Sequence, residues 1–128
     1  MTNRQPALDP DLLTALRELA DGDAAFLHEL LESFERDSAT YVRQLHGAQI
    51  FGNRVAFGRN AHALAGAAMN IGATTLVAMC RENELAMSRG GVFPTVEDFQ
   101  RILDEINRVL YEARDLSMDS YLEAVRAS

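Results

Sequence analysis

The sequence has 128 residues and a formal net charge of -7, from 19 acidic and 12 basic side chains, all of the basic ones arginine. A chain of this size and ordinary composition is expected to form one globular domain, and its negative charge disfavours binding to nucleic acid. No apolar stretch reaches the ~20 residues of a membrane span, and residues 1–10 lack the features of a signal peptide, so we expect a cytoplasmic protein without a membrane segment.

The first elements along the chain are a short helix and a long one. Residues 1–8 are expected to form a flexible start, and leucines at helical spacing predict a short helix over residues 11–20. Asp23 is a good N-cap for a long helix that runs to about residue 48. The apolar stripe of this helix comprises Phe26, Leu27, Leu30, Leu31, Phe34, Tyr41, Val42 and Leu45.

Two further helices follow a short connection at residues 49–53. One runs over about 54–69 and is closed by Gly72, and the other runs over about 74–89. The second of these carries its apolar side chains inward, with the single cysteine expected to be a small core residue. These inward side chains are Leu76, Met79, Cys80 and Ala86.

The last helix is capped by Thr95 and runs to about residue 114. Its apolar face comprises Val96, Phe99, Ile102, Leu103, Ile106, Val109 and Leu110. Residues 115–119 look like a break, after which residues 121–125 form a short helix or extend the previous one. The sequence therefore predicts an all-α fold: an antiparallel four-helix bundle over residues 9–128, with an extra short N-terminal helix and a possible C-terminal helical extension.

Residues 61–73 are nearly all small. On a helix, His62, Gly66 and Met69 share one face, and the histidine points away from the apolar face. Gly66 costs ~1 kcal/mol of helix stability relative to Ala, and a need for clearance beside His62 would explain its presence. The apolar face of this segment comprises Ala61, Leu64, Ala68 and Ile71.

The segment resembles the motif of histidine-containing phosphotransfer domains, which carry H-x-L-K-G followed by small residues and a Gly-Ala pair. In this sequence the motif stands as His62, Leu64, Gly66, Ala67, Ala68, Gly72 and Ala73. Upstream, residues 22–34 resemble the opening of the first long helix of the family. Downstream, the next helix of the family is matched by Cys80, Glu84, Ala86, Arg89 and Gly90.

The resemblance implies a phosphoryl carrier that exchanges a phosphoryl group between His62 and aspartates of response-regulator receiver domains in a two-component phosphorelay. A solvent-exposed imidazole is mostly neutral at pH 7, so one ring nitrogen has a lone pair that can attack phosphorus. The expected partner is a receiver domain, a hybrid histidine kinase or both, and the receiver would supply Mg²⁺. We expect the carrier itself to be a monomer with no cofactor and no independent catalytic activity.

The sequence departs from the motif at Ala65, where the family has Lys. That Lys, three residues after His62, would lie within reach of the phosphoryl oxygens. Arg59, three residues before His62, is the candidate substitute, and the alternative is an ordinary solvated arginine. Glu84 is a second candidate neighbour, which would accept the imidazole N–H, and the alternative is a surface carboxylate.

Several other residues carry narrower predictions. Asn83 stands where the family usually has an inward Leu, so either it finds a hydrogen-bond partner or the helical phase shifts locally. His28 and His46 are expected to be surface residues. The residues expected to contact the partner around His62 are Ala63, Ala67 and Met69.

Three alternative functions remain open. The loss of the motif Lys is compatible with a degenerate member of the family, an adaptor that binds a receiver or another signalling protein without efficient phosphotransfer. A self-associating module would use the small-residue helix as a dimer face and bury His62 between subunits. A metal or haem bundle is the least favoured, because the sequence lacks Glu-x-x-His pairs on two helices.

Overall fold

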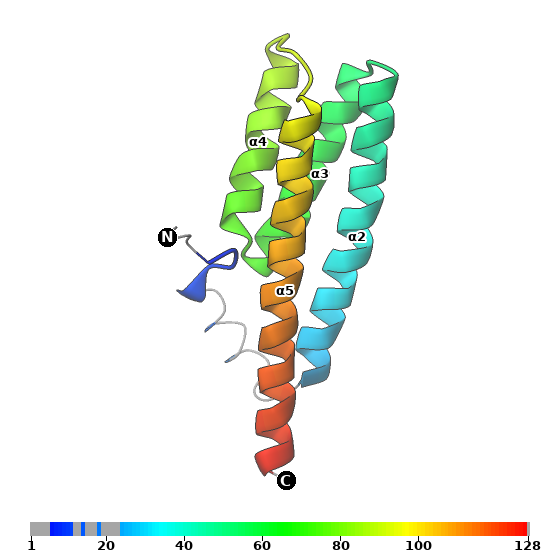
Figure 1. Cartoon of the computed structure of the whole chain (residues 1–128). Helices are drawn as coiled ribbons and strands as arrows, with labels where there is room; N and C mark the ends of the chain where they lie inside the picture. The colour runs from blue at the N-terminus through cyan, green and yellow to red at the C-terminus, as the bar shows by residue number, and fades with distance from the viewer. Residues whose placement is uncertain (1–5, 12–13, 15–17, 19–23, 128) are drawn as a thin grey trace.

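The computed structural model describes residues 6–11, 14, 18 and 24–127, and for residues 116–127 it gives the course of the backbone. Four long helices lie side by side (Figure 1). They are α2 (Ala24–Ile50), α3 (Arg54–Ile71), α4 (Thr74–Ser88) and α5 (Val96–Ala127). Short connections make successive helices antiparallel. No strand occurs among the described residues, and the predicted all-α bundle is confirmed.

Each helix of the bundle packs against two others. Helix α3 contacts α2 and α4, and α5 contacts the same two helices. Local signals set the helix ends. Asn53 begins α3 by accepting the amide of Ala56 at 3.0 Å, and Gly72 ends it with a left-handed φ of 75°. Thr95 and Asp98 cap α5 reciprocally, each side chain accepting the other residue's amide, at 3.1 and 3.3 Å. The predicted stop at Gly72 and the predicted cap at Thr95 are confirmed.

The core is formed by the apolar faces of all four helices. The predicted faces are largely confirmed, but Phe26 and Val96 are exposed, the latter at 83 %. Both lie in the first turn of a helix, where fewer side chains of neighbouring helices are available to cover them. Phe57 and Met87 are buried although the sequence analysis did not assign them to the core. The largest fully buried side chains include Phe57, Leu8, Leu45, Leu64, Leu76, Ile102 and Val109.

The C-terminal part of the chain forms the helical extension that the sequence analysis gave as one alternative, but without the break expected before it. Helix α5 continues without interruption to Ala127, so the break expected at residues 115–119 is wrong. That segment contains polar residues but neither Gly nor Pro. Because adding a residue to an existing helix is much easier than starting one, modest helix formers continue a helix that the apolar face upstream has already established.

The start of the chain also differs from the prediction. Ala7 and Leu8 are fully buried, and their amides donate to the two carboxylate oxygens of Glu112 on α5, at 2.9 and 3.1 Å. The amide of Asp9 donates to the carbonyl of Gly72 at 2.8 Å. The prediction that the flexible segment extends to residue 8 is therefore wrong for these two residues.

The predicted N-terminal helix lies mostly outside the described residues. The described residues within and next to it are helical, namely Pro10, Asp11, Thr14 and Glu18.

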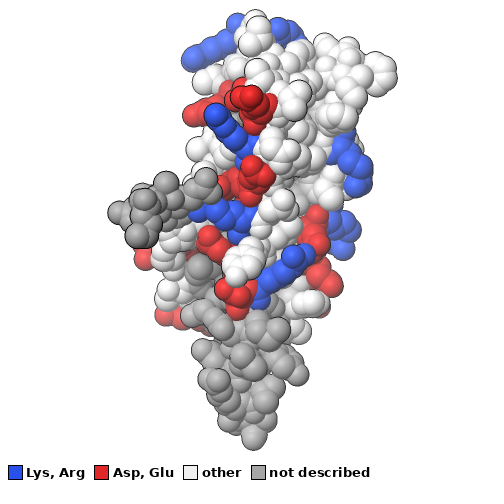
Figure 2. Space-filling view, viewed as in Figure 1, with Lys and Arg blue, Asp and Glu red and all other residues white. Residues whose placement is uncertain are grey.

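Charged side chains of both signs are mixed on the face seen in Figure 2. On the face that α4 and α5 form, acidic and basic groups alternate along the helices (Figure 2). Arg114 on α5 reaches Glu35 on α2 at 3.0 Å, and Arg108 pairs with Glu105 on its own helix at 3.1 Å. Within the described part of the chain, no helix combines the length and apolarity needed to cross a bilayer.

Candidate functional site

His62 lies in the middle of α3 with its side chain directed to solvent. Its side chain is 77 % exposed, whereas Ala61, Leu64 and Ala68 on the other face of the helix are buried. The face predicted from the helical spacing is therefore observed. Because the apolar face holds α3 against its neighbours, the orientation of the imidazole is fixed by the packing of the helix that carries it.

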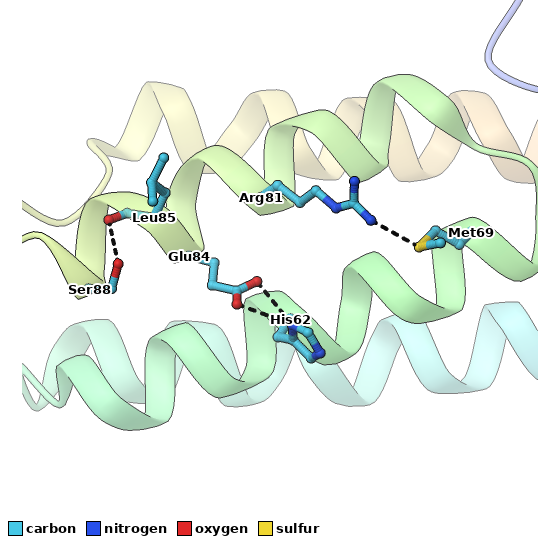
Figure 3. A network of polar contacts seen from close by, with 6 residues as sticks. All are labelled: His62, Met69, Arg81, Glu84, Leu85 and Ser88. Carbon is cyan, nitrogen blue, oxygen red and sulfur yellow. Dashed lines mark hydrogen bonds and ion pairs between the residues drawn. The ribbon is translucent and has the colours of Figure 1, made fainter.

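Glu84, on the adjacent helix α4, contacts the imidazole directly. Both of its carboxylate oxygens lie 3.1 Å from Nδ1 of His62 (Figure 3). An ionised carboxylate can only accept hydrogen bonds, so this contact requires a proton on Nδ1. A neutral ring in that tautomer keeps its free lone pair on Nε2, and this nitrogen points away from Glu84 (Figure 3).

Open space lies next to the imidazole on α3. Gly66, one turn after His62, is exposed, and a Cβ atom built there would have no neighbour within 4 Å. No side chain among the described residues therefore fills the position that the missing side chain leaves. The exposed face of α3 one turn after His62 is therefore open within 4 Å of that position.

Ala65, the residue at the position of the motif Lys, lies in the core. Its side chain is only 4 % exposed and belongs to the core, so it does not border the exposed face of His62. The reason is its position one turn after the buried Ala61. A longer side chain at residue 65 would have to leave the packed core before it could reach the surface.

Arg59 lies one turn before His62 and is exposed, as expected from its spacing. It makes no ion pair or hydrogen bond with another side chain of the described residues. Together with parts of α4 it borders a groove of about 420 Å³ that begins at His62, and we call this the α3–α4 groove. Its lining residues are Arg54, Val55, Gly58, Arg59, His62, Glu84, Met87 and Ser88.

The residues predicted to contact a partner lie on α3 after His62, on the side away from the α3–α4 groove. Met69 is 53 % exposed, and its sulfur accepts a hydrogen bond from Nη2 of Arg81 on α4 at 3.3 Å (Figure 3). Ala63 and Ala67 are half-buried between the exposed and core faces. Of the three, Met69 presents the largest accessible side chain.

For Asn83, the sequence predicted either a hydrogen-bond partner or a local shift of the helical phase, and the structure shows the hydrogen-bond partner. The Nδ2 of Asn83 donates to the carbonyl of Met79, one turn earlier on α4, at 2.8 Å. The half-buried amide is thus satisfied within its own helix, and the helical phase does not shift.

The remaining candidate groups lie apart from His62. His28 and His46 are both exposed, as predicted: His28 contacts Glu32 at 3.1 Å, and His46 lies beside the ring of Phe99. Burial raises the pKa of the Cys80 thiol to about 12, which disfavours the reactive thiolate. Among the described side chains, no three His, Cys, Asp or Glu groups are close enough to hold a metal ion.

The part of the groove that lies away from His62 was not predicted from the sequence. Val55 on α3 and Met87 and Ser88 on α4 were not assigned to the site, although they line the groove. A signal for them existed. In antiparallel helices that pair His62 with Glu84, residues before His62 must lie opposite residues after Glu84.

Comparisons with known proteins agree with this geometry. The family model described as Hpt domain matches residues 29–116, more than half of the chain and the part that contains His62, Gly66 and Glu84. The crystal structure of histidine-containing phosphotransfer protein B (HptB) from Pseudomonas aeruginosa PAO1 is similar, with a TM-score of 0.59 and 29% sequence identity over 96% of this chain and 98% of that chain. Among curated proteins, none matches the sequence significantly.

Proposed function

The chain belongs to the histidine-containing phosphotransfer (Hpt) domain family of two-component signalling, and we propose that it relays a phosphoryl group between His62 and an aspartate of a response-regulator receiver domain. The observation that carries the proposal is the exposed imidazole with Nδ1 held by Glu84 and Nε2 free. The receiver, alone or as part of a hybrid histidine kinase, is the proposed partner.

The transfer step requires no proton to move. The Nε2 lone pair of His62 attacks phosphorus of the aspartyl phosphate, the N–P bond forms, and the P–O bond breaks with its electron pair remaining on the aspartate carboxylate. The Nδ1 proton stays on the ring, which gains positive charge. Glu84 lies 3.1 Å from that nitrogen, so its carboxylate offsets the new charge, and the reverse transfer follows the same path.

The proposed surroundings of the phosphoryl group come from α3 and from the partner. The open space at Gly66 lets the phosphoryl group approach the helix, and Arg59 is an exposed cation one turn away that can neutralise phosphoryl oxygens in place of the motif Lys. We propose that the receiver contributes Mg²⁺, which neutralises the oxygens during transfer. The carrier then supplies a positioned nucleophile and has no catalytic activity of its own.

The test is incubation of the chain with a panel of receiver domains phosphorylated with ³²P, followed by detection of acid-labile, alkali-stable phosphate on the chain. His62→Gln should abolish labelling and leave the circular dichroism spectrum unchanged, because the side chain is exposed. His28→Gln and His46→Gln are matched controls and should be labelled like the wild type. Labelling of the His62→Gln variant would refute the assignment.

Glu84 is proposed as a positioning residue rather than a reacting one. Glu84→Ala should leave the ring as a mixture of its two neutral tautomers and slow the transfer, since part of the population then carries its proton on Nε2. Glu84→Gln keeps an oxygen that accepts a hydrogen bond from Nδ1–H, so it should restore the single tautomer and much of the rate. The ¹⁵N chemical shifts of the His62 ring nitrogens report the tautomer directly, and identical shifts in all three proteins would contradict this role.

One observation favours a second candidate function. The position of the motif Lys is held by Ala65, whose side chain lies in the core, so the chain lacks the usual cation there. An adaptor that binds a receiver without efficient transfer would show receiver binding and no label on His62 in the same assay. Efficient labelling of His62 excludes the adaptor.

A further inference from the structure

The α3–α4 groove extends well beyond the reacting imidazole. It begins at His62 and reaches Val55, seven residues earlier on α3, which corresponds to about 10 Å along the helix. Its opposite wall is formed by Met87 and Ser88 on α4. His62 lines only one end of this groove, and its Nε2 points away from Glu84, so most of the groove has no part in the transfer step itself.

The charge of the groove is opposite in sign to that of the whole chain. Arg54 and Arg59 line it against a single acid, Glu84, and that acid already contacts His62. Neither arginine forms an ion pair with any described acid. The guanidinium of Arg54 lies 5.6 Å from the centre of the Phe93 ring, and its Nη1 is buried without a hydrogen-bond partner among the described residues. The net charge of -7 makes this local excess of cations a distinct feature of the surface.

The rest of the groove is apolar or small. Val55 is 69 % exposed although it is a large aliphatic residue, whereas Met87, which lines the groove on α4, is largely buried. Gly58 adds no side chain to the groove, and a Cβ atom there would make an ordinary contact with Cβ of Met87 at 3.8 Å. Exposed aliphatic surface beside unpaired arginines matches a partner segment in which a carboxylate stands next to apolar side chains.

We propose that the α3–α4 groove is a specificity surface that binds an acidic and apolar segment of the cognate receiver domain. The inference rests on the proposed function. A receiver that brings its aspartate to Nε2 of His62 must lie over the ground around that residue, and the groove is continuous with it. Complementary charge at such a surface raises the association rate and discriminates among related receivers.

The test uses two substitutions of opposite charge at one exposed position. Val55→Glu and Val55→Arg both remove the aliphatic side chain from the first turn of α3, so a difference between them reports charge alone. The probe is the receiver that labels His62 fastest in the panel, loaded with Mg²⁺ and beryllofluoride, and its dissociation constant is measured by fluorescence anisotropy. Val55→Glu should weaken binding about fivefold relative to Val55→Arg at 0.1 M salt, and the difference should shrink as salt is added.

A matched control pair is available on α5. Val96 is also an exposed valine in the first turn of a helix, but it lies outside the groove and on the helix that does not pack closely against α3. Val96→Glu and Val96→Arg should bind the receiver with equal affinity. Circular dichroism of all four variants checks that the fold is retained.

The outcomes separate this inference from the proposed function. If His62 is labelled by the receiver but the two Val55 variants bind it equally, the groove is not the specificity surface and the relay function stands. The Val55 substitutions could instead change the sedimentation of the chain and leave its affinity for the receiver unchanged. The groove would then bind a second copy of the chain, and the relay function would still stand. If no receiver labels His62 and none binds the chain, both proposals fall.

Discussion

Gly66→Ala should make the protein more stable and a poorer phosphoryl acceptor. Alanine is favoured over glycine by ~1 kcal/mol in a helix interior, and the added methyl group would meet no atom within 4 Å. No steric cost therefore offsets the gain, and the expected stabilisation is about 0.5–1 kcal/mol, or about 2–5 °C in the melting midpoint. Thermal and urea denaturation followed at 222 nm measure it.

The same methyl group should slow transfer from a phosphorylated receiver. It would occupy the space beside His62 that we assign to the incoming phosphoryl group or receiver surface, and overpacking a fitted contact costs about 1 kcal/mol or more. A decrease in rate of at least about fivefold is expected. A lower melting midpoint would show that the space is not open, and an unchanged rate would show that the receiver leaves this space empty.

Gly47→Ala is the matched control for this experiment. Gly47 lies in the last turns of α2, and a Cβ atom there also meets nothing within 4 Å. The substitution should stabilise the protein in the same direction, by a smaller amount because helix ends contribute less, and leave phosphotransfer unchanged. Loss of transfer in both glycine variants would show that the effect at Gly66 is not local to the imidazole.

Three further predictions concern other parts of the fold. Since burial raises the pKa of Cys80 to about 12, the thiolate is scarce at pH 7, and iodoacetamide should label the cysteine slowly in the native protein and rapidly in urea; fast native labelling would contradict the burial. Glu112→Ala removes the acceptor of two N-terminal amides and should lower the free energy of unfolding by about 1–3 kcal/mol, measured by urea denaturation, and Glu112→Gln should recover part of it. Thr95→Ala should cost about 1 kcal/mol through loss of the α5 cap, whereas Thr95→Ser should cost little; equal stability of both variants would exclude a capping role.

Much of the fold was predictable because its determinants are local. Apolar residues at helical spacing located all four helices, and Thr95 and Gly72 marked ends that depend on short-range hydrogen bonds and backbone conformation. Spacing does not tell how far a neighbouring helix extends, so it assigned Phe26 and Val96 to covered faces although both are exposed in the first turns of their helices. The break expected at residues 115–119 failed because helix growth is cooperative, and a local run of polar residues does not overcome it.

The site divides in the same way between local and long-range information. The exposed face of His62 and the gap at Gly66 follow from one helix alone, and the sequence predicted both. The contact with Glu84 depends on the register of two helices and was suggested by family resemblance rather than by periodicity. The burial of Ala65 follows from its position one turn after the buried Ala61, which the motif alone does not convey.

The anchoring of residues 7–9 has a practical consequence for attaching anything to the front of this chain. Two amides are held by Glu112 on α5 and a third by the carbonyl of Gly72, so the polypeptide leaves the bundle next to the turn between α3 and α4. Gly72 in that turn is ten residues after His62, which corresponds to about 15 Å along α3. A fluorophore or fusion partner joined ahead of residue 6 would thus be tethered at the turn rather than over His62, whereas trimming the chain past Leu8 would open a hole in the core.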